Sequence, residues 1–408
     1  MMKTFGVNAA VVIVSVVIML LLGEATLRLF PSLIDVAVLD RFHPVPRSEV
    51  AARLGLPVSA ERKKVSAAQR NDGGSDFYIY RSGAKKVYMV DEVDLLAGGV
   101  PVLQLDRKGF NNPLEKADRS AADIVMIGDS FTFGSIQNAS NTFSARLEEL
   151  TGLTTYNLGI GGIGLYEYLQ LYRLFGASLK PRMVVMNIYE GNDLRDAVRY
   201  SNYKSGTGTP KRKKQPAGGL FASSYVLAFL KSSIELAVKS ISRPVEIDFH
   251  YDVVSQGRRV AMNITNSDTD EVKYARRIAA GEINFDVFDA ALASFSRLAK
   301  EHAFIPVVSY LPSAYSAYRQ DVRFRDTQVG RDVLGNADAQ RAWFKQAAIR
   351  HKLYFIDMTE AFVEAVKTRP LTHFPANVHF TSEGHRVAVA TLENFILNCG
   401  CLDENYPF

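Results

Sequence analysis

Cysteine is nearly absent from this sequence, whose 408 residues include only two, Cys399 and Cys401. Two cysteines cannot form the disulfide framework that stabilises small secreted domains. A bridge between them would be tight, because a single residue separates them, and it would require an oxidising compartment. Their spacing does not suggest a zinc site. This usage is more typical of a bacterial periplasmic or cytosolic protein than of a small secreted one.

The excess of one charge sign is also small. The 48 Lys and Arg residues exceed the 43 Asp and Glu residues by 5. One dense basic run, Lys211–Lys214, lies in a stretch rich in Gly, Pro and Ser at residues 205–219. Such a run is typical of a solvated loop. Because no nucleic-acid-binding motif accompanies it, we expect no nucleic-acid partner.

Apolar residues, in contrast, are plentiful, and one long run stands near the start of the chain. Val7–Gly23 is almost wholly apolar, and Glu24 and Arg28 are its nearest charged neighbours on the C-terminal side. A run of this kind is a signal peptide or a spanning helix. The small-residue pattern of a cleavage site is missing, so we predict an uncleaved, single-pass membrane anchor over residues 1–30. The rest of the chain would then lie outside the cytoplasm, as in a bacterial inner-membrane protein with a periplasmic domain.

The remaining chain divides by its pattern of strands and helices. Residues 31–120 form a juxtamembrane extension punctuated by Gly and Asp. Strands and helices alternate over 121–398, interrupted by an inserted segment at 195–285, and 399–408 are a C-terminal tail. The strands are continuous apolar runs, which parallel sheets covered on both faces require. We therefore predict an α/β fold, a three-layer α/β/α domain with a parallel sheet.

Individual elements follow from the same patterns. We expect a hairpin over 245–251 and 259–264. The predicted strands of the sheet are 123–128, 155–158, 183–188, 305–311 and 354–356. The predicted helices are 143–150, 165–175, 287–302, 338–351 and 385–397.

The first candidate for chemistry is the serine of Gly128-Asp129-Ser130. This serine directly follows a predicted strand, on a turn where a substrate carbonyl can reach it. The alternative is a helix cap, a common role for Asp and Ser at such turns. The motif is not a phosphate-binding loop, because no Gly-Lys-Ser/Thr follows.

Two further motifs follow the next two predicted strands. Gly162 ends a glycine-rich turn, in which a backbone N–H can face a ligand; the alternative is an ordinary tight turn. Asn192, in Gly191-Asn192-Asp193, can offer its side-chain NH₂ to a developing oxyanion; the alternative is an Asx turn.

The fourth motif, residues 379–385, leads into the last predicted helix. It begins with His379 and ends with His385. His379 is a candidate general base for Ser130, whereas His385 falls at the start of the helix and fits a structural role. A single histidine says little. The set of Ser, Gly, Asn and His in this order is the specific signal.

These four blocks resemble the SGNH/GDSL hydrolase superfamily, over about residues 121–195 and 285–398. The long gap between the third and fourth blocks, together with the apolar N-terminal run, also resembles its membrane-anchored, alginate O-acetyltransferase-like branch. The resemblance implies a flavodoxin-like sheet. It implies Ser130 as nucleophile and His379 as base, with an oxyanion hole from the N–H groups of Ser130 and Gly162 and the amide of Asn192. It implies neither a metal nor an organic cofactor.

One position departs from the family pattern. The family usually has Asp two or three residues before the histidine, where this chain has Asn377 and Ala376. Asn377 can accept the imidazole N–H, but it cannot stabilise the imidazolium as a carboxylate does. We predict either a slower, dyad-like enzyme or the participation of another carboxylate. Asp357 is the candidate, with capping of the next helix as its alternative role.

The sequence thus predicts a serine esterase or deacetylase that acts on acyl esters, above all acetyl esters, of cell-envelope or exported carbohydrate. One alternative is an O-acetyltransferase that uses the same residues within an exopolysaccharide machinery. The other is a non-catalytic envelope protein that kept the fold, which Asn377 motivates.

Overall fold

The computed structural model describes most of the chain in eleven ranges and assigns it to two compact units. The described residues are 2–30, 33–34, 62–65, 77–80, 85–87, 95–97, 102–116, 118–205, 224–241, 247–262 and 269–402. One unit combines Met1–Ser59 with Lys211–Glu246, and the other combines Ala60–Pro210 with Ile247–Phe408.

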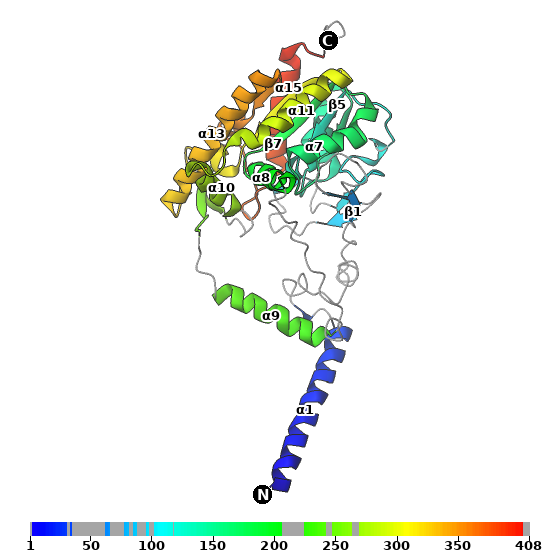
Figure 1. The fold of residues 1–408 in the computed structure, drawn as a ribbon, viewed down its shortest axis with the longest axis vertical. Helices are drawn as coiled ribbons and strands as arrows, with labels where there is room; N and C mark the ends of the chain where they lie inside the picture. The colour runs from blue at the N-terminus through cyan, green and yellow to red at the C-terminus, as the bar shows by residue number, and fades with distance from the viewer. Residues whose placement is uncertain are drawn as a thin grey trace. The chain divides into compact units, whose positions relative to one another are not determined.

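The larger unit is built around a five-stranded parallel sheet (Figure 1). Its strands in chain order are β5 (Ile124–Ile127), β6 (Thr155–Asn157), β7 (Met183–Tyr189), β10 (Ile305–Leu311) and β12 (Tyr354–Asp357). Their order across the sheet is β12-β10-β7-β5-β6. This is the 2-1-3-4-5 order of flavodoxin-like folds, and it confirms the predicted parallel sheet.

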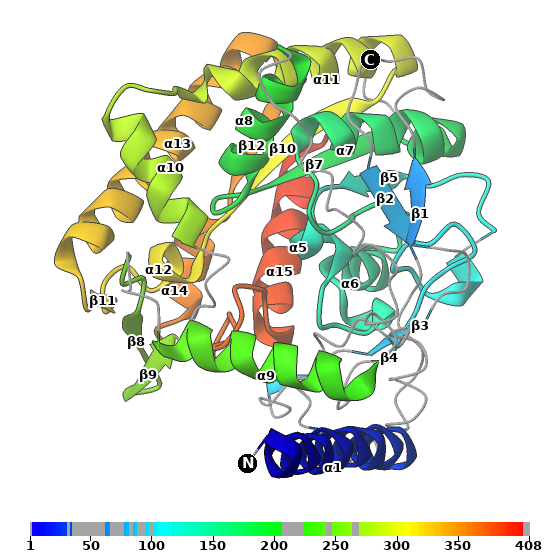
Figure 2. The same ribbon diagram turned by 60° about the horizontal axis from the view of Figure 1, so that its bottom comes forward.

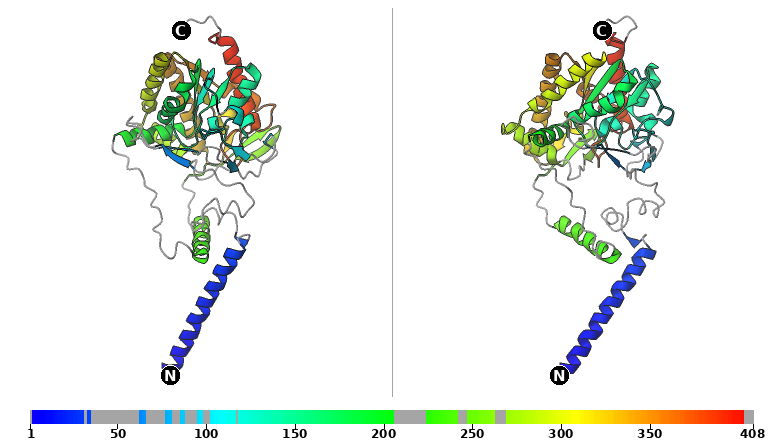
Figure 3. Two further views of the ribbon diagram at one scale, coloured as in Figure 1. Left: turned by 90° about the vertical axis from the view of Figure 1, so that its right-hand side faces the viewer. Right: turned by 45° about the vertical axis from the view of Figure 1, so that its right-hand side comes forward.

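Helices cover both faces of this sheet, as Figures 1 and 3 show, which confirms the three predicted layers. One face packs against α7 (Leu165–Leu171), α8 (Asp193–Lys204) and α11 (Asp289–His302). The other packs against α6 (Phe143–Thr151), α14 (Thr359–Ala365) and α15 (Ser382–Cys399), with α6 and α15 side by side (Figure 2). The long α13 (Thr327–His351) contributes side chains to both faces.

The apolar strands explain why the sheet forms where it does. Successive side chains of a strand point to opposite faces, so a strand buried on both faces needs apolar residues throughout. In β5, Val125 and Ile127 enter one core while Ile124 and Met126 enter the other, and all four are fully buried. Both faces therefore need a helical cover.

Smaller elements surround the sheet. A hairpin of β8 (Tyr251–Ser255) and β9 (Arg258–Met262) pairs with β11 (Arg323–Phe324). The antiparallel pairs β1 (Arg62–Val65) with β2 (Phe77–Tyr80), and β3 (Lys85–Val87) with β4 (Val102–Gln104), precede it in the chain. The short helices are α5 (Ser130–Phe133), α10 (Thr269–Ala279) and α12 (Ala314–Ala317).

The segment just before the sheet is part of the larger unit. Leu105 and Phe110 are fully buried in the core. The Tyr156 hydroxyl donates to the buried Asp106 carboxylate at 2.5 Å, and the Asn112 side chain donates to the Asn157 carbonyl at 2.9 Å. Residues 102–116 thus pack with the sheet, although the domain predicted from the sequence begins only at residue 121.

The smaller unit contains α1 (Met2–Leu29) and α9 (Tyr225–Ile241), which meet at one end of each helix. The Glu24 carboxylate accepts hydrogen bonds from Ser224 Oγ and from the backbone N–H groups of Tyr225 and Val226, at 2.9–3.0 Å. Burial alone would raise the pKa of Glu24, but these donors and Arg28 lower it to about 2. Glu24 therefore acts as the anionic cap of α9.

A membrane-spanning anchor is not confirmed. Within the part of the chain that the structure describes, no helix is both long and apolar enough to cross a membrane. The last turns of α1 instead carry Glu24 and Arg28, which form an ion pair with each other and contact Tyr225 of α9.

A disulfide joins the two cysteines after the last helix. The Cys399–Cys401 bridge closes over Gly400, whose φ of +57° gives α15 its left-handed C-cap. Glycine adopts this backbone conformation without strain, which makes it the usual residue at a helix end. The tight bridge that the sequence allows is thus present.

Candidate active site

Three of the four motifs lie at one edge of the sheet. Ser130, the turn of Gly162, and Asn192 follow the carboxyl ends of β5, β6 and β7. In a sheet of this order the chain reverses its direction of winding between β5 and β7, and ligands bind in the crevice outside that point. The topology alone therefore brings Ser130 and Asn192 to the expected binding crevice.

The Ser130 turn is built by its two neighbours. A Cβ on Gly128 would lie 2.0 Å from Thr132 Oγ1, so only glycine allows the turn to close. The Asp129 carboxylate caps α5 by accepting the Phe131 N–H at 2.9 Å. Ser130 occupies the first position of this helix, where an N–H group has no partner within the helix. Capping thus falls to Asp129, and the Ser130 hydroxyl is left for other contacts.

The Ser130 hydroxyl meets His379 across 249 residues of sequence. Ser130 Oγ lies 2.7 Å from His379 Nε2. On the other side of the ring, His379 Nδ1 contacts Asn377 Oδ1. Both Ser130 and His379 are partly exposed, so a substrate can reach the pair. This is a nucleophile in contact with a base that a third residue orients.

Asn377 fixes which nitrogen of His379 carries the proton. Its Oδ1 also accepts the backbone N–H of His379 at 3.1 Å, so the oxygen rather than the NH₂ faces the ring. An oxygen acceptor requires a proton on Nδ1. Nε2 is then the free acceptor that can take the proton of Ser130.

Asp357 takes the alternative role that its sequence position suggests. Its carboxylate accepts the Thr359 N–H at 3.0 Å, at the start of α14, and lies 3.7 Å from Arg341 Nε. The residue beside the imidazole is Asn377.

The glycine-rich turn lies against the Ser130 helix. A Cβ on Gly161 would lie 3.3 Å from Ser130 Cβ, which places this turn next to the nucleophile. Gly162 follows with a φ of +83° and is exposed, with open space where a side chain would stand. An exposed peptide beside Ser130 is suited to offer its N–H to a substrate oxygen.

Substitution of Gly159 tests how closely this turn approaches α5. A Cβ at Gly159 would lie 2.1 Å from the backbone nitrogen of Phe133, which no side-chain motion can relieve. We expect Gly159→Ala to lower the free energy of unfolding by about 3 kcal/mol or more, as overpacking against fixed atoms does. The control is Gly335→Ala in α13, where a Cβ meets nothing within 4 Å. It should be neutral or stabilise by about 0.5–1 kcal/mol. Equal denaturant midpoints for the two variants would contradict the tight approach.

Asn192 is directed toward the Ser130 turn. It precedes α8, but its side chain makes no capping hydrogen bond to that helix. Its amide instead donates to the Asp129 carboxylate, the neighbour of Ser130. A carboxylate only accepts hydrogen bonds, so the NH₂ group must face this turn. The NH₂ has two N–H donors, and one of them is left for an oxyanion.

Three buried carboxyl groups belong to the Ser130 turn and to the start of α8. Asp129, Asp193 and Asp196 are all fully buried. Burial raises the pKa of Asp129 and of Asp193. Repulsion by Asp196 raises the pKa of Asp129 further, and repulsion by Asp129 raises that of Asp193. Asp193 accepts the Tyr168 hydroxyl at 2.6 Å, while Asp196 pairs with Arg195 at 2.9 Å. Asp196 has a direct arginine partner, whereas the pKa values of Asp129 and Asp193 lie above the usual range for an aspartate.

Aromatic rings support the histidine. Phe131 stacks on Tyr189 with ring centroids 3.9 Å apart, and its ring lies 5.0 Å from that of His379. Phe380 packs edge-on against Phe131 at 4.8 Å. No motif in the sequence indicates this support, although Phe131 and Phe380 directly follow Ser130 and His379 in the chain.

The two neighbouring histidines are structural. His385 is buried in α15, where its Nδ1 accepts the Phe143 N–H at 3.2 Å. His373 is buried beside Phe380 and donates from Nε2 to the Pro312 carbonyl at 3.2 Å. Burial lowers the pKa of each to about 3, so both stay neutral near pH 7. The structural role predicted for His385 agrees with these contacts.

Comparisons with known proteins give similarities at low identity only. No protein-family model and no curated protein matches the chain. A lipolytic protein of the G-D-S-L family from Desulfitobacterium hafniense is 13% identical (TM-score 0.36), with 66% of this chain and 97% of that chain covered. A GDSL-like lipase from Bacteroides thetaiotaomicron is 15% identical (TM-score 0.34), with 72% and 94% covered. A catalytic mutant of an acetylxylan esterase from Geobacillus stearothermophilus is 17% identical (TM-score 0.36), with 68% and 95% covered.

Proposed function

We propose that this protein is a serine hydrolase of ester bonds, with Ser130 as nucleophile and His379 as general base. The observation that supports it most is the hydrogen-bonded series from Ser130 Oγ through His379 to Asn377. A serine in contact with an oriented imidazole is the arrangement that activates a hydroxyl for attack on a carbonyl carbon.

The first half of the reaction forms an acyl-enzyme. Ser130 Oγ bonds to the ester carbonyl carbon while its proton passes to His379 Nε2, and the carbonyl oxygen becomes an oxyanion. The N–H groups of Ser130 and Gly162 and the amide of Asn192 stabilise that charge. The bond to the alcohol oxygen then breaks, and the alcohol leaves with the proton from His379.

The second half returns the serine. Water attacks the acyl carbon while His379 takes one of its protons, and Ser130 Oγ leaves with that proton. In a transferase a sugar hydroxyl would take the place of this water. Asn377 keeps His379 in the productive tautomer throughout, but without the negative charge that stabilises an imidazolium. We therefore expect a slower enzyme than one with aspartate at this position.

We propose acetyl esters of carbohydrate as the substrate class, in line with the sequence resemblance. The test is incubation with acetylated xylo-oligosaccharides, alone and with an excess of unacetylated acceptor, followed by measurement of free acetate and of acceptor mass. Acetate release supports the esterase. A gain of about 42 Da on the acceptor, the net change when an acetyl group replaces a hydroxyl hydrogen, identifies the transferase. If neither product forms and simple esters are also left intact, the proposed function is wrong.

A further inference from the structure

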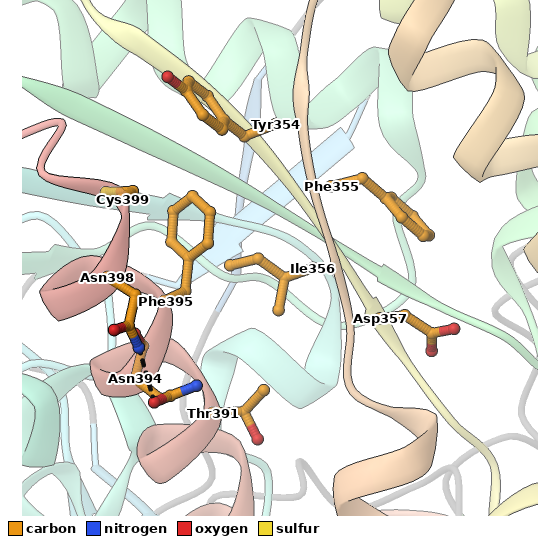
Figure 4. Close-up of a pocket in the computed structure, with 9 residues that line it drawn as sticks. All are labelled: Tyr354, Phe355, Ile356, Asp357, Thr391, Asn394, Phe395, Asn398 and Cys399. Atoms are coloured by element: carbon orange, nitrogen blue, oxygen red, sulfur yellow. Dashed lines mark hydrogen bonds between the residues drawn. The ribbon is translucent and has the colours of Figure 1, made fainter.

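A hollow lies between the edge strand β12 and the last helix, α15 (Figure 4). Its volume is about 500 Å³, within the range of sites that hold small ligands. None of the proposed catalytic residues lines it. We name it the edge groove, and its residues used below are Tyr354, Asp357, Thr391, Asn394, Phe395 and Asn398.

The helix side of the edge groove is polar, and its two asparagines, Asn394 and Asn398, are exposed. Thr391, Asn394, Phe395 and Asn398 are spaced i, i+3, i+4 and i+7, so they share one face of α15. The buried face of the same helix is apolar and includes Leu392. The polar face lies beside this apolar stripe and borders the groove, so a ligand in the groove would meet hydrogen-bonding amides on the helix side.

The two amides hold each other in place. The Asn398 side-chain NH₂ donates to the Asn394 carbonyl at 2.7 Å and to Asn394 Oδ1 at 2.9 Å. These bonds fix both amide planes, as the dashed line in Figure 4 shows for the side chains. The Asn394 NH₂ donors and the Asn398 carbonyl acceptor are then available at an exposed position. An oriented pair of one donor group and one acceptor suits a ligand with neighbouring hydroxyls.

The aromatic contacts and the charges near the groove narrow the class of ligand further. Phe395 packs against Tyr354 with centroids 5.7 Å apart, so the groove has an aromatic wall. The Asp357 side chain points to the other side of β12 from α15 (Figure 4) and faces the Arg341 guanidinium at 3.7 Å, so it adds no free charge to the groove. A phosphate or a cationic ligand would lack a partner of opposite charge here. A neutral sugar fits, because its C–H face packs on aromatic rings while its hydroxyls exchange hydrogen bonds with amides.

We propose that the edge groove binds a neutral carbohydrate chain, as a second site for the polymer whose esters Ser130 cleaves. This inference rests on the proposed function for its choice of carbohydrate. A chain held at the edge groove raises the local concentration of its acetylated units at Ser130.

The experiment is calorimetric titration of full-length Ser130→Ala protein, which cannot turn over an ester. The probes are xylo-, cello- and manno-oligosaccharides of about four to six units, which are long enough to fill a pocket of this size. We expect at least one probe to bind, and Asn394→Ala/Asn398→Ala in the same background to weaken it about tenfold, or about 1.4 kcal/mol. Leu397→Ala, an exposed change on the same helix outside the groove, should bind like its parent.

The outcomes separate this inference from the proposed function. Equal affinity of the double variant and the Leu397→Ala control would contradict carbohydrate binding at the edge groove. The absence of binding by all three kinds of probe would contradict it as well. Hydrolysis of p-nitrophenyl acetate is measured separately with Ser130 restored, and it should be the same in the double variant and in the Leu397→Ala control. If the parent and both variants all lack this activity, the proposed esterase function is wrong. The titration still shows whether the edge groove binds carbohydrate.

Discussion

Ser130→Ala is expected to lower the turnover of p-nitrophenyl acetate by about 10⁴-fold or more, judged from the effect of removing the nucleophile in a serine protease. The expectation follows from the 2.7 Å contact of Ser130 Oγ with His379 Nε2, because this contact activates the hydroxyl. The measurement is kcat/KM by initial rates. A small residual rate would remain, since oxyanion donors still stabilise attack by water.

Two controls make this result specific. Ser178→Ala removes an exposed hydroxyl that donates to the Phe175 carbonyl at 3.5 Å, and it should retain the parent rate. His379→Ala should lose as much as Ser130→Ala, and the double variant should lose no more than either, because the two residues act as a unit. Additive losses would show that Ser130 and His379 do not act together.

Asn377→Asp is expected to raise kcat by about 10- to 10³-fold. In a serine protease the reverse change costs about 10⁴ because the wrong tautomer is favoured. Here Asn377 already holds the proton on His379 Nδ1, so the gain is limited to the charge that stabilises the imidazolium. The same charge should move the acid limb of the pH–rate profile to higher pH, because the base must lose its proton before it can act.

The matched control for this gain is Asp357→Asn. Asp357 accepts the Thr359 N–H at the start of α14, and asparagine caps a helix about as well as aspartate, so we expect little change in the free energy of unfolding and no change in kcat. If Asn377→Asp leaves both kcat and the pH profile unchanged, Asn377 does not orient the general base. If Asp357→Asn lowers kcat instead, Asp357 supplies the missing charge.

Much of the sheet follows from the sequence because its strands are continuous apolar runs. The strand predicted at 305–311 coincides with β10, and that predicted at 183–188 is one residue shorter than β7. Helices with little apolar character were harder to predict. The prediction omits α8 and α10, whose inward-facing apolar residues are few and separated by charges.

Two other differences between the predicted and the observed elements concern the start of α13 and the hairpin. The α13 helix begins at Thr327, well before the predicted 338, because Gly330 and Gly335 lower the helix propensity of its first turns. Gly330 has a packing reason, since a Cβ there would lie 2.6 Å from the Phe324 ring. The hairpin turns at Gln256 and Gly257, both with positive φ, inside the expected 252–258 connection, and β9 agrees with the predicted 259–264 to within two residues. Its first strand, β8, lies later in the chain than the predicted 245–251, because Gln-Gly is a weaker turn signal than Asn-Gly.

The site was predictable as a set of residues, but its contacts were not. Chain order indicates Ser130, Gly162, Asn192 and His379, and the topology places the strands that three of them follow. The bond from Asn192 to Asp129 and the stack of Phe131 on Tyr189 join distant segments, and no local pattern encodes them. The location outside the cytoplasm stays a prediction.

The most direct test of the central claim is reaction with an organophosphonate that modifies activated serines, followed by peptide mass mapping. We predict one adduct per chain, on Ser130, that is absent from Ser130→Ala and forms much more slowly in His379→Ala. An adduct on another serine, or none in the parent protein under conditions that label a known serine esterase, would contradict the assignment of Ser130 as the activated nucleophile.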